Sequence, residues 1–331
     1  MHNGEATPRY QFFDLKPALP DMTAEVLHGL TRPAKSIPPK YFYDAEGSRL
    51  FDVITGLPDY YLTRTETSIL RENAGSIADR VGKSACLVEY GSGSSTKSRL
   101  VIEACRPAAY VPVDISRVHL EESAKALLGG YPELAVYPMC ADYTAPFELP
   151  PPVAALPRLA FFPGSSIGNF EPPAARDFLR GVTQVVGPGG WLVLGVDTKK
   201  DPEVLDRAYT DPGGVTERFN KNLLRNVNNA VGADFDPSGF RHSPSTTCKR
   251  AASRCTWCPI GTNGSMLRVP RSTSPRASGC TRRTPTSTGR RSSSALPTRA
   301  ASTASMSCAT TGPTSWCCCF GLVKVRSRLV R

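Results

Sequence analysis

Two hydrophobic patterns divide the first 242 residues of the chain. Residues 1–83 carry apolar positions at helical spacing between polar, proline-rich connections such as TRPAKSIPPKY, so we expect mostly helix there. From Ser84, helix-length segments alternate with short apolar runs: ACLVEYG, AAYVPVD, ELAVYPMC, RLAFFPGS and GWLVLGVD. Such alternation is typical of parallel strands that crossover helices bury on both faces. The sequence therefore predicts an α/β, doubly wound, Rossmann-like sheet over residues 84–198.

Residues 199–242 return to helical spacing. Two helices are expected here, broken at Pro212-Gly213-Gly214, and the second presents a packing face of Leu223, Leu224 and Val227. No run of about 18 apolar residues occurs, so no membrane-spanning helix is expected. The N-terminus has no signal or transit pattern. We therefore expect a cytoplasmic chain in which helical segments flank a sheet domain.

The last 89 residues, 243–331, differ from everything before them. They hold 15 of the 40 basic residues, none of the 29 acidic ones and eight of the eleven cysteines, whereas residues 1–242 have a net charge of −4. Thirty of these 89 residues are Ser or Thr, yet the segment includes two tryptophans and the run WCCCF. A disordered basic segment is normally poor in Cys and Trp. The net charge of +11 is thus a property of this tail alone.

A frame shift of one base accounts for the tail. If each codon joins the third base of one residue to the first two of the next, Trp316 and the three cysteines after it must encode Val-Leu-Leu, part of a buried strand. The same shift gives valine at Trp257-Cys258. We interpret residues 243–331 as an out-of-frame or disordered basic tail and expect it to be irregular. CTWC at Cys255–Cys258 has zinc-ribbon spacing, but no second pair matches it, so no metal site is expected.

The segment LVEYGSGSSTKSRL carries the clearest chemical signal. A strand ends near Glu89, and Gly91-Ser92-Gly93 turns into a helix whose N-terminus favours an anionic ligand group. A phosphate-binding P-loop needs a glycine before Lys97, and a dinucleotide fingerprint needs a third glycine at the Thr96 position. An acid two residues before the turn instead resembles the first motif of S-adenosylmethionine-dependent methyltransferases.

Polar residues follow the next three strands in register. Asp114 can accept hydrogen bonds from ribose hydroxyls, and Asp142 with Tyr143 can hold an adenine amino group and ring face. FFPGSSIGNF ends at Asn169, which can both donate and accept. Because ligands of open α/β sheets lie beyond the carboxyl ends of the strands, these residues are expected to share one crevice.

Four separated motifs together resemble the histidine-specific methyltransferases, the L-histidine Nα-methyltransferases of ergothioneine biosynthesis. They are KSIPPKYFYDAEGSRLFDVITGLPDYYLTRTE, EYGSGSSTK, PGSSIGNF and AYTDPGGVTERFNKNLL with ADFDPSGF, and they span about Arg32 to His242. The resemblance implies a class I methyltransferase sheet with a mostly helical substrate-binding domain formed by residues 1–83 and 199–242. It also implies S-adenosyl-L-methionine as methyl donor and three methyl transfers to the histidine α-amine, giving hercynine.

The resemblance also implies roles for particular residues. The donor would contact Gly91, Lys97, Asp114, Asp142 and Tyr143. L-histidine would be held by Tyr60, Asn169 and Tyr209. Tyr43 and Tyr60 would position the reacting amine, with no acid or base catalyst. Tyr43, Tyr60 and Tyr61 are equally consistent with packed core aromatics when the resemblance is left aside.

The tail departs from this family. The family binds the imidazole through a Glu and a Ser in a C-terminal TENSYKY-type segment, which the printed tail lacks, although RRTPTST at Arg282–Thr288 can encode ENSYKY after the shift. We therefore expect a monomer with an intact donor site, weak folding and little activity. Two alternatives stay open: an amine acceptor other than histidine, and a nucleic-acid-binding protein that uses the basic tail. The tail lacks the basic–aromatic interleaving typical of the latter, so neither nucleic acid nor membrane is expected as a partner.

Overall fold

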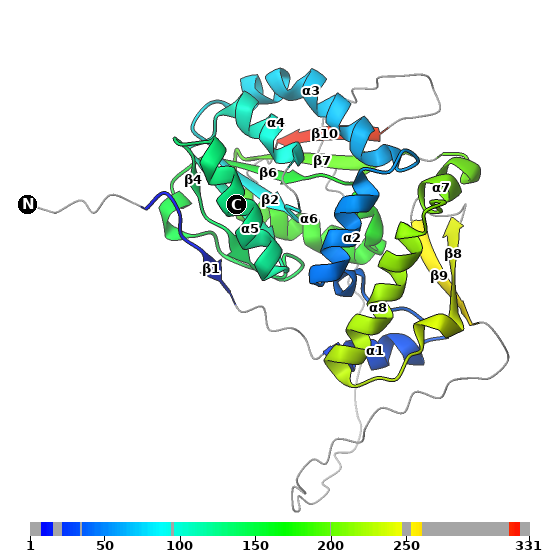
Figure 1. The fold of residues 1–331 in the computed structure, drawn as a ribbon. Helices are drawn as coiled ribbons and strands as arrows, with labels where there is room; N and C mark the ends of the chain where they lie inside the picture. Colours follow the sequence, from blue (N-terminus) through cyan, green and yellow to red (C-terminus); the bar gives the residue numbers. More distant parts are fainter. Residues whose placement is uncertain are drawn as a thin grey trace, which may run out of the picture.

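The computed structural model describes residues 8–15, 22–33, 35–93, 96–198, 200–246, 253–259 and 318–324. Within them, eight strands form one sheet in the order β1-β5-β3-β2-β6-β7-β10, with β4 beside β3 (Figure 1). All neighbouring pairs are parallel except β7 with β10. The strands are β1 (Phe13–Asp14), β2 (Cys86–Tyr90), β3 (Ala109–Asp114), β4 (Ala135–Val136), β5 (Met139–Cys140), β6 (Arg158–Phe162), β7 (Trp191–Asp197) and β10 (Cys318–Lys324).

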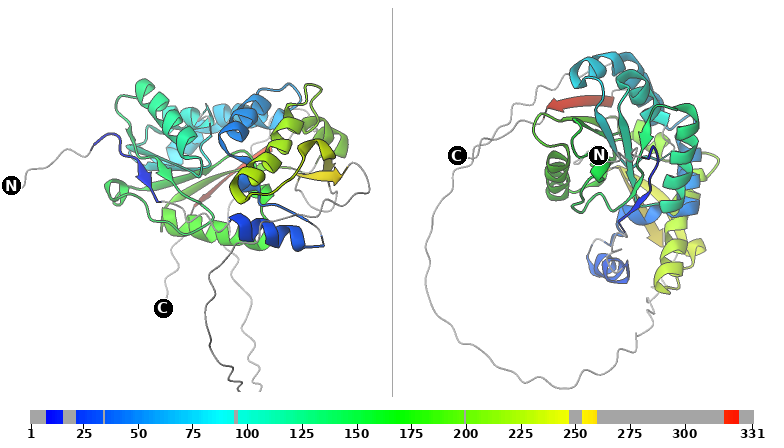
Figure 2. Two further views of the ribbon diagram at one scale, coloured as in Figure 1. Left: turned by 60° about the horizontal axis from the view of Figure 1, so that its bottom comes forward. Right: turned by 90° about the vertical axis from the view of Figure 1, so that its left-hand side faces the viewer.

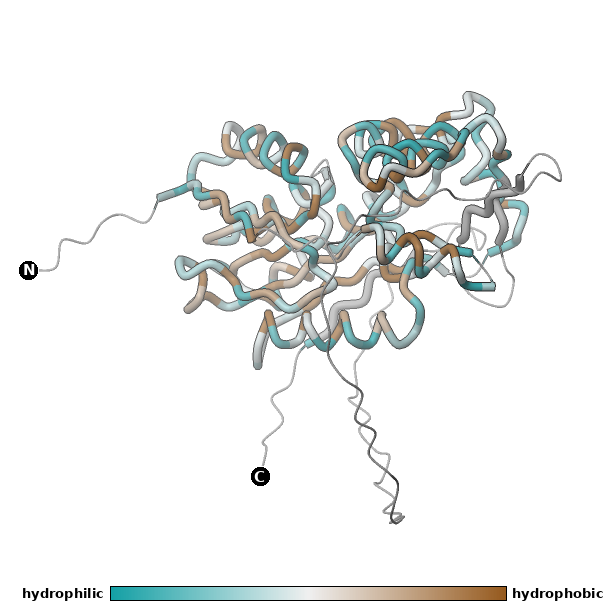
Figure 3. The backbone as a smooth tube through the Cα atoms, turned by 90° about the horizontal axis from the view of Figure 1, so that it is seen from below, coloured by the Kyte–Doolittle hydropathy of each residue, from teal (hydrophilic) through white to brown (hydrophobic). Residues whose placement is uncertain are grey.

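Helices cover both faces of this sheet because alternate strand residues point to opposite sides. Leu87 of β2 packs in one core cluster with residues of α3 (Tyr61–Val81), α4 (Thr96–Cys105) and α5 (Arg117–Gly130). The next residue, Val88, packs in another cluster with residues of α6 (Pro172–Val186). Figure 3 shows hydrophobic, brown backbone along the sheet and teal positions on the outer turns of the helices. The predicted doubly wound α/β sheet is confirmed.

A second group of elements packs beside the carboxyl ends of the strands. It consists of α1 (Met22–Thr31), η1 (Pro39–Phe42), α2 (Ala45–Thr55), α7 (Pro202–Ala208), α8 (Val215–Val231), η4 (Pro237–Gly239), β8 (Phe240–Thr246) and β9 (Ser253–Pro259). Val26 of α1, Tyr41 of η1 and Leu223 and Val227 of α8 form its small core. α8 also holds η1 through the Asn226 side-chain amide, which donates to the Tyr41 carbonyl at 2.8 Å. The expected helices on either side of Pro212 are thus confirmed as α7 and α8.

The sheet differs from expectation at one edge. ELAVYPMC forms two short strands, β4 and β5, because Pro138 between them has no N–H to donate to a neighbouring strand. The two-residue strand β1 was not expected. It extends the sheet through the Phe13 amide, which donates to the Pro138 carbonyl at 2.8 Å. Two further short elements, η2 (Pro151–Val153) and η3 (Ser166–Asn169), flank β6.

The described parts of the tail are strands, whereas an irregular tail was expected. β8 pairs antiparallel with β9, and β10 pairs antiparallel with β7, from Cys318 opposite Asp197 to Lys324 opposite Trp191 (Figure 2, red). CCFGLVK is apolar enough to cover β7, whose unpaired backbone groups would otherwise form an open edge. Residues 260–317, including the segment aligned with ENSYKY, lie outside the described residues. No described helix is long and apolar enough to cross a membrane.

Candidate active site

The glycine turn after β2 leaves space beside the sheet. Gly91 has φ +72°, and a Cβ atom placed there would lie 3.8 Å from the Tyr143 ring and hydroxyl. Ser92, only 5% exposed, has a hydroxyl without a hydrogen-bond partner among the described residues. A buried hydroxyl in this state costs free energy unless a ligand satisfies it. The turn therefore fits a polar ligand that approaches the backbone closely.

Asp114 lies at the end of β3, next to this turn. Its carboxylate accepts a hydrogen bond from the Ser116 amide at 2.9 Å, which fixes the side chain. Burial raises its pKa, while backbone hydrogen bonds, led by that of Ser116, oppose the shift. The carboxylate is thus held as a fixed acceptor, which suits the ribose hydroxyls of a nucleoside.

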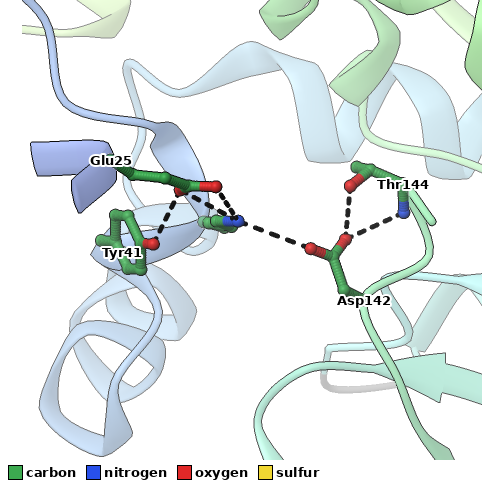
Figure 4. Close-up of polar contacts among 5 residues, drawn as sticks. Glu25, Tyr41, Asp142 and Thr144 are labelled. Atoms are coloured by element: carbon green, nitrogen blue, oxygen red, sulfur yellow. Dashed lines mark hydrogen bonds and ion pairs between the residues drawn. The ribbon is translucent and has the colours of Figure 1, made fainter. Parts of the chain in front are cut away.

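Asp142 and Tyr143 follow β5. One Asp142 carboxylate oxygen accepts from the Thr144 amide at 2.9 Å and from its hydroxyl at 2.5 Å. The other oxygen lies 3.5 Å from the Lys40 ammonium (Figure 4). The Tyr143 ring packs edge-on against Tyr90, 6.1 Å between centroids, over the glycine turn. The pair therefore offers a carboxylate and an aromatic face at the place expected for adenine.

In the structure, Lys97 forms an ion pair with a buried acidic residue. Its ammonium lies 2.6 Å from the carboxylate of Glu66 on α3. The same carboxylate accepts from the Gly164 amide at 2.8 and 2.9 Å. Glu66 thus joins α3, the start of α4 and the loop after β6. Sequence reasoning missed it, although a charged residue on the helix face of Leu62 and Ile69 was a usable signal.

Glu89 lies beneath the turn rather than in the crevice. It is 1% exposed and accepts hydrogen bonds from the hydroxyls of Ser98 and Tyr110. Burial raises its pKa to about 7, and these two hydrogen bonds oppose the shift. Glu89 therefore fastens α4 and β3 to the end of β2, which holds the glycine turn in place.

The tyrosines expected on the acceptor side form one aromatic cluster. The ring of Tyr60 lies edge-on to Tyr209, with centroids 6.1 Å apart, and to Phe51 at 6.3 Å. Tyr43 lies edge-on to Phe51 at 5.6 Å. Burial raises the pKa of Tyr43, and the neighbouring Asp114 carboxylate adds to the rise. The structure therefore brings these three tyrosines together, with Tyr43 facing the donor side.

Asn169 is less closely integrated with this cluster. It ends η3, in the loop that Gly164 begins, and its side chain is exposed. No described hydrogen bond links it to the tyrosines. The loop is placed instead by two contacts at its start: Glu66 on the Gly164 amide, and the Asp197 amide, which donates to the Ser165 hydroxyl at 2.8 Å. The contacts at the start of the loop thus place the backbone of Asn169 near the crevice.

His242 supports the acceptor side and was not identified from sequence. One ring nitrogen lies 3.0 Å from the Tyr209 carbonyl, and the other lies 3.3 Å from the Asn220 side-chain amide. With Asn220 donating, the ring must carry its proton on Nε2 to donate to Tyr209. His242 therefore ties α8 to the end of α7, where Tyr209 lies.

Taken together, the turn, the acids and the aromatic cluster form two adjoining halves. The donor half consists of Gly91, Ser92, Asp114, Asp142 and Tyr143. The acceptor half consists of Tyr43, Phe51, Tyr60 and Tyr209. The unsatisfied Ser92 hydroxyl, the open glycine turn and two fixed carboxylates fit a nucleoside with a polar tail. The aromatic half fits a small cation next to it.

Comparison with known proteins agrees with this chemistry. The family model of histidine-specific, S-adenosylmethionine-dependent methyltransferases matches residues 22–257. The chain is 42% identical to the histidine N-alpha-methyltransferase of Mycolicibacterium smegmatis, over 67% of this chain and 71% of that protein. It is 34% identical to ergothioneine biosynthesis protein 1 of Neurospora crassa, over 60% of this chain and 23% of that protein. It is 27% identical to the 4-dimethylallyltryptophan N-methyltransferase of Claviceps purpurea, over 58% of this chain and 59% of that protein.

Proposed function

Because this chain belongs to the family of histidine-specific, S-adenosylmethionine-dependent methyltransferases, we propose that it methylates the α-amine of L-histidine three times, giving hercynine. The observation that carries the proposal is the proximity of the two halves: the Asp114 carboxylate of the donor half is near enough to Tyr43 of the aromatic cluster to add to the rise of its pKa, which burial causes first. The match to the Mycolicibacterium protein, at 42% identity, supports histidine as the acceptor.

In the donor half, we assign the acids to the two ends of the nucleoside. Asp114 would accept from the ribose hydroxyls, and Asp142 from the adenine amino group, with Tyr143 against the ring. Gly91 would leave room for the amino-acid part of the donor. The Ser92 hydroxyl would donate a hydrogen bond to this part or accept one from it. Lys97, neutralised by Glu66, would contribute by holding the loop at Gly164 rather than by its charge.

In the acceptor half, the tyrosines would position the amine. When bound, S-adenosylmethionine supplies a methyl carbon on a sulfonium sulfur, ready for attack by an amine lone pair. Burial raises the pKa of Tyr60 well above its ordinary value, so its hydroxyl stays neutral and can hydrogen-bond the amino acid. The ring faces attract the ammonium as it gains methyl groups, by about 0.5–2 kcal/mol. The histidine ammonium must lose one proton to solvent before each transfer, and each transfer breaks the bond between the methyl carbon and sulfur to leave S-adenosylhomocysteine. We assign no general base, and positioning provides the remaining catalysis.

The acceptor assignment also involves Tyr209 and Asn169. Tyr209 packs on Tyr60 and would contact the amino acid from α7, and the exposed Asn169 amide would reach its carboxylate or amine from the loop after β6. We further propose a cytoplasmic monomer without nucleic-acid or membrane partners. Its three cysteines before residue 243 are scattered, buried and unpaired, which suits a reducing compartment.

We expect the activity of this chain to depend on the sequence of its tail. We propose that residues 243–331 are out of frame, so that the Glu and Ser of the family's imidazole pocket are missing. The test compares the full chain with a chain whose tail is recoded one base earlier. Each is incubated with S-adenosylmethionine and with histidine, a tryptophan derivative or another amine as acceptor, and methylated products are followed by mass spectrometry. A hydrogen bond to a charged group is worth about 1.5–3 kcal/mol and a neutral one about 1, so recoding should raise the rate roughly 10²–10³-fold.

Four results of this test are informative. Trimethylhistidine from the recoded chain alone supports both proposals. Equal, robust activity of the two chains contradicts the frame interpretation and leaves the function intact. A tryptophan derivative or another amine accepted in preference to histidine would favour the second acceptor class, to which the Claviceps relative points at 27% identity. No methylation by either chain would contradict the proposed function.

A further inference from the structure

Lys40 joins two parts of the molecule that are far apart in sequence. Its ammonium lies 3.1 Å from the Glu25 carboxylate on α1 and 3.5 Å from the Asp142 carboxylate after β5 (Figure 4). The Lys40 side chain is 21% exposed, and that of Asp142 is 14% exposed. Solvent therefore screens this pair less than a surface pair. Neither Lys40 nor Glu25 was assigned a role from the sequence.

On one side, Lys40 belongs to a segment that side chains connect to α1 and α8. Glu25 also accepts from the Tyr41 hydroxyl at 2.7 Å, so it holds two consecutive residues of η1. The Asn226 amide donates to the Tyr41 carbonyl at 2.8 Å, and the Phe42 ring stacks on Phe219 at 5.1 Å. These contacts fasten η1 to α1 and α8. The segment therefore moves with the acceptor half.

On the other side, Lys40 reaches the Asp142 oxygen that the local turn does not use. Thr144 occupies Oδ1 with two hydrogen bonds, and Lys40 faces Oδ2. A carboxylate oxygen has two lone pairs, so Oδ2 can accept from Lys40 and from an adenine amino group together. The donor's adenine and the acceptor-side segment thus share one atom of the protein.

The position of Lys40 in the chain gives this contact a consequence. Tyr43 follows three residues later, and Asp44, next to it, caps α2 by accepting from the Gly47 amide at 2.7 Å. Asp44 is also held by the Asn222 amide of α8 at 2.7 Å. Lys40 and Tyr43 therefore lie on one short segment that Asp44 connects to α2 and α8, so the position of Lys40 constrains that of Tyr43.

We propose that Lys40 is a positioning residue that couples the two halves: adenine bound at Asp142 orders residues 39–48 through Lys40 and so places Tyr43 for the acceptor. The inference rests on the proposed function, because it takes Asp142 as the adenine contact. It gives the Glu25–Lys40–Asp142 bridge a role in positioning Tyr43, in addition to the adenine contact of Asp142.

Hydrogen exchange of the full chain, with and without S-adenosylhomocysteine, tests this coupling. The amides of Tyr41 and Tyr43 make long bonds, 3.2 and 3.4 Å, and should exchange quickly in the free protein. S-adenosylhomocysteine should slow exchange in peptides over residues 39–48 as well as over the glycine turn. In Lys40→Met the turn should still be protected, while the protection of residues 39–48 is lost. Calorimetry should show S-adenosylhomocysteine binding weakened about fivefold, as a partly buried ion pair contributes to affinity.

Two variants serve as controls. Lys35→Met removes the same charge five residues earlier, where the ammonium donates to the exposed Leu30 carbonyl at 2.6 Å; it should behave as the wild type. Lys40→Arg keeps the cation and should restore ligand-dependent protection. If Lys40→Met fails to fold, Glu25→Gln tests the other end of the bridge and should weaken the same protection.

The outcomes separate the inference from the proposed function. If S-adenosylhomocysteine protects residues 39–48 equally in the wild type and in Lys40→Met, the inference is wrong and the donor site stands. If it protects neither the glycine turn nor residues 39–48 in the wild type, the proposed donor site itself is wrong. Loss of protection in Lys35→Met to the same degree as in Lys40→Met also overturns the inference, since any nearby charge would then suffice.

Discussion

The two halves of the site are positioned in different ways. The residues of the donor half lie at the ends of strands: Gly91 follows β2, Asp114 ends β3 and Asp142 follows β5. The backbone hydrogen bonds between these neighbouring strands therefore set the spacing of the three residues. The acceptor half is held by side chains instead. Tyr43, Tyr60 and Tyr209 lie at the ends of three separate elements; Tyr60 contacts Tyr209, and the Phe51 ring links Tyr43 to Tyr60. A backbone-positioned half tolerates distant changes better than a half built from side-chain contacts.

The difference matters because the tail touches the halves unequally. β10 pairs with the outer edge of β7 and contacts α3, which begins after Tyr60, and it pairs with none of β2, β3 and β5. β8 packs beside α7 and α8 and pairs with β9; Tyr209 lies at the end of α7, and α8 carries residues that hold η1. A wrong tail sequence should therefore weaken the acceptor half first.

Glu66→Ala should affect both halves of the site, because Glu66 joins them. Its loss leaves the Lys97 ammonium and the Gly164 amide without their buried acceptor. Breaking a buried pair by removing one partner costs about 3–5 kcal/mol of stability. Urea unfolding should show this decrease in the free energy of unfolding, and S-adenosylhomocysteine binding should weaken as well.

Glu66→Gln and Glu121→Ala are the matched variants. Glutamine keeps an acceptor for Gly164, so it should lose less stability than alanine. Glu121 pairs with Lys125 on the exposed surface of α5, at 2.7 Å, and its removal should be nearly neutral. A loss for Glu66→Ala no larger than for Glu121→Ala would show that the buried pair does not join the halves.

Glu89 should make the stability of the donor half depend on pH. Its pKa is about 7 in the folded chain, raised by burial from 4.5. Between these values the folded state keeps a proton that the unfolded state has lost, so stability falls as pH rises from about 4.5 to 7. The full effect is up to about 3 kcal/mol, since one pKa unit corresponds to about 1.4 kcal/mol.

Glu89→Gln isolates this contribution. The difference in unfolding free energy between wild type and variant should change through that pH window and level off above pH 7. A difference that is constant with pH would mean that Glu89 is already ionised in the folded chain. The hydrogen bonds from Ser98 and Tyr110 would then outweigh its burial.

The same contrast explains what the sequence could predict. Buried parallel strands read as continuous apolar runs, so β2, β3, β6 and β7 could be placed, and with them Gly91, Asp114 and Asp142 at the strand ends. β1 could not be placed, because a strand of two residues is too short to show a hydrophobic period. Glu66, Lys40 and His242 were missed because their roles depend on tertiary partners 31, 102 and 33 residues away in the chain.

The tail shows the limit in the other direction. Its sequence has no strand period, yet Cys318–Lys324 pairs along the whole of β7. A stretch of chain beside an uncovered strand edge can pair through its backbone N–H and C=O groups, and this pairing does not require a particular pattern of side chains. Backbone pairing of this kind does not restore the polar groups of an imidazole pocket, which are side-chain properties.

Asp114→Asn should affect the donor half alone. Asparagine keeps an oxygen for the Ser116 amide but loses the charge that strengthens hydrogen bonds from ribose hydroxyls. A charge-assisted hydrogen bond is worth about 1.5–3 kcal/mol, so S-adenosylhomocysteine should bind roughly 10–100-fold more weakly in calorimetry. Hydrogen exchange around Tyr209 should be unchanged. Binding that survives unaltered would place the ribose elsewhere.

His242→Ala is the converse test and should have the smallest effect. It removes the ring that donates to the Tyr209 carbonyl at 3.0 Å, while Asn220 keeps its bond to the Thr216 carbonyl at 2.9 Å. The loss of one half-buried hydrogen bond is worth about 1 kcal/mol, so amides at the end of α7 should exchange roughly fivefold faster. S-adenosylhomocysteine affinity should not change, and His28→Ala on the exposed face of α1 should alter neither quantity. If His242→Ala weakened donor binding as much as Asp114→Asn, the donor half would depend on the side-chain contacts around Tyr209. The backbone of the strands would then not be what protects the donor half.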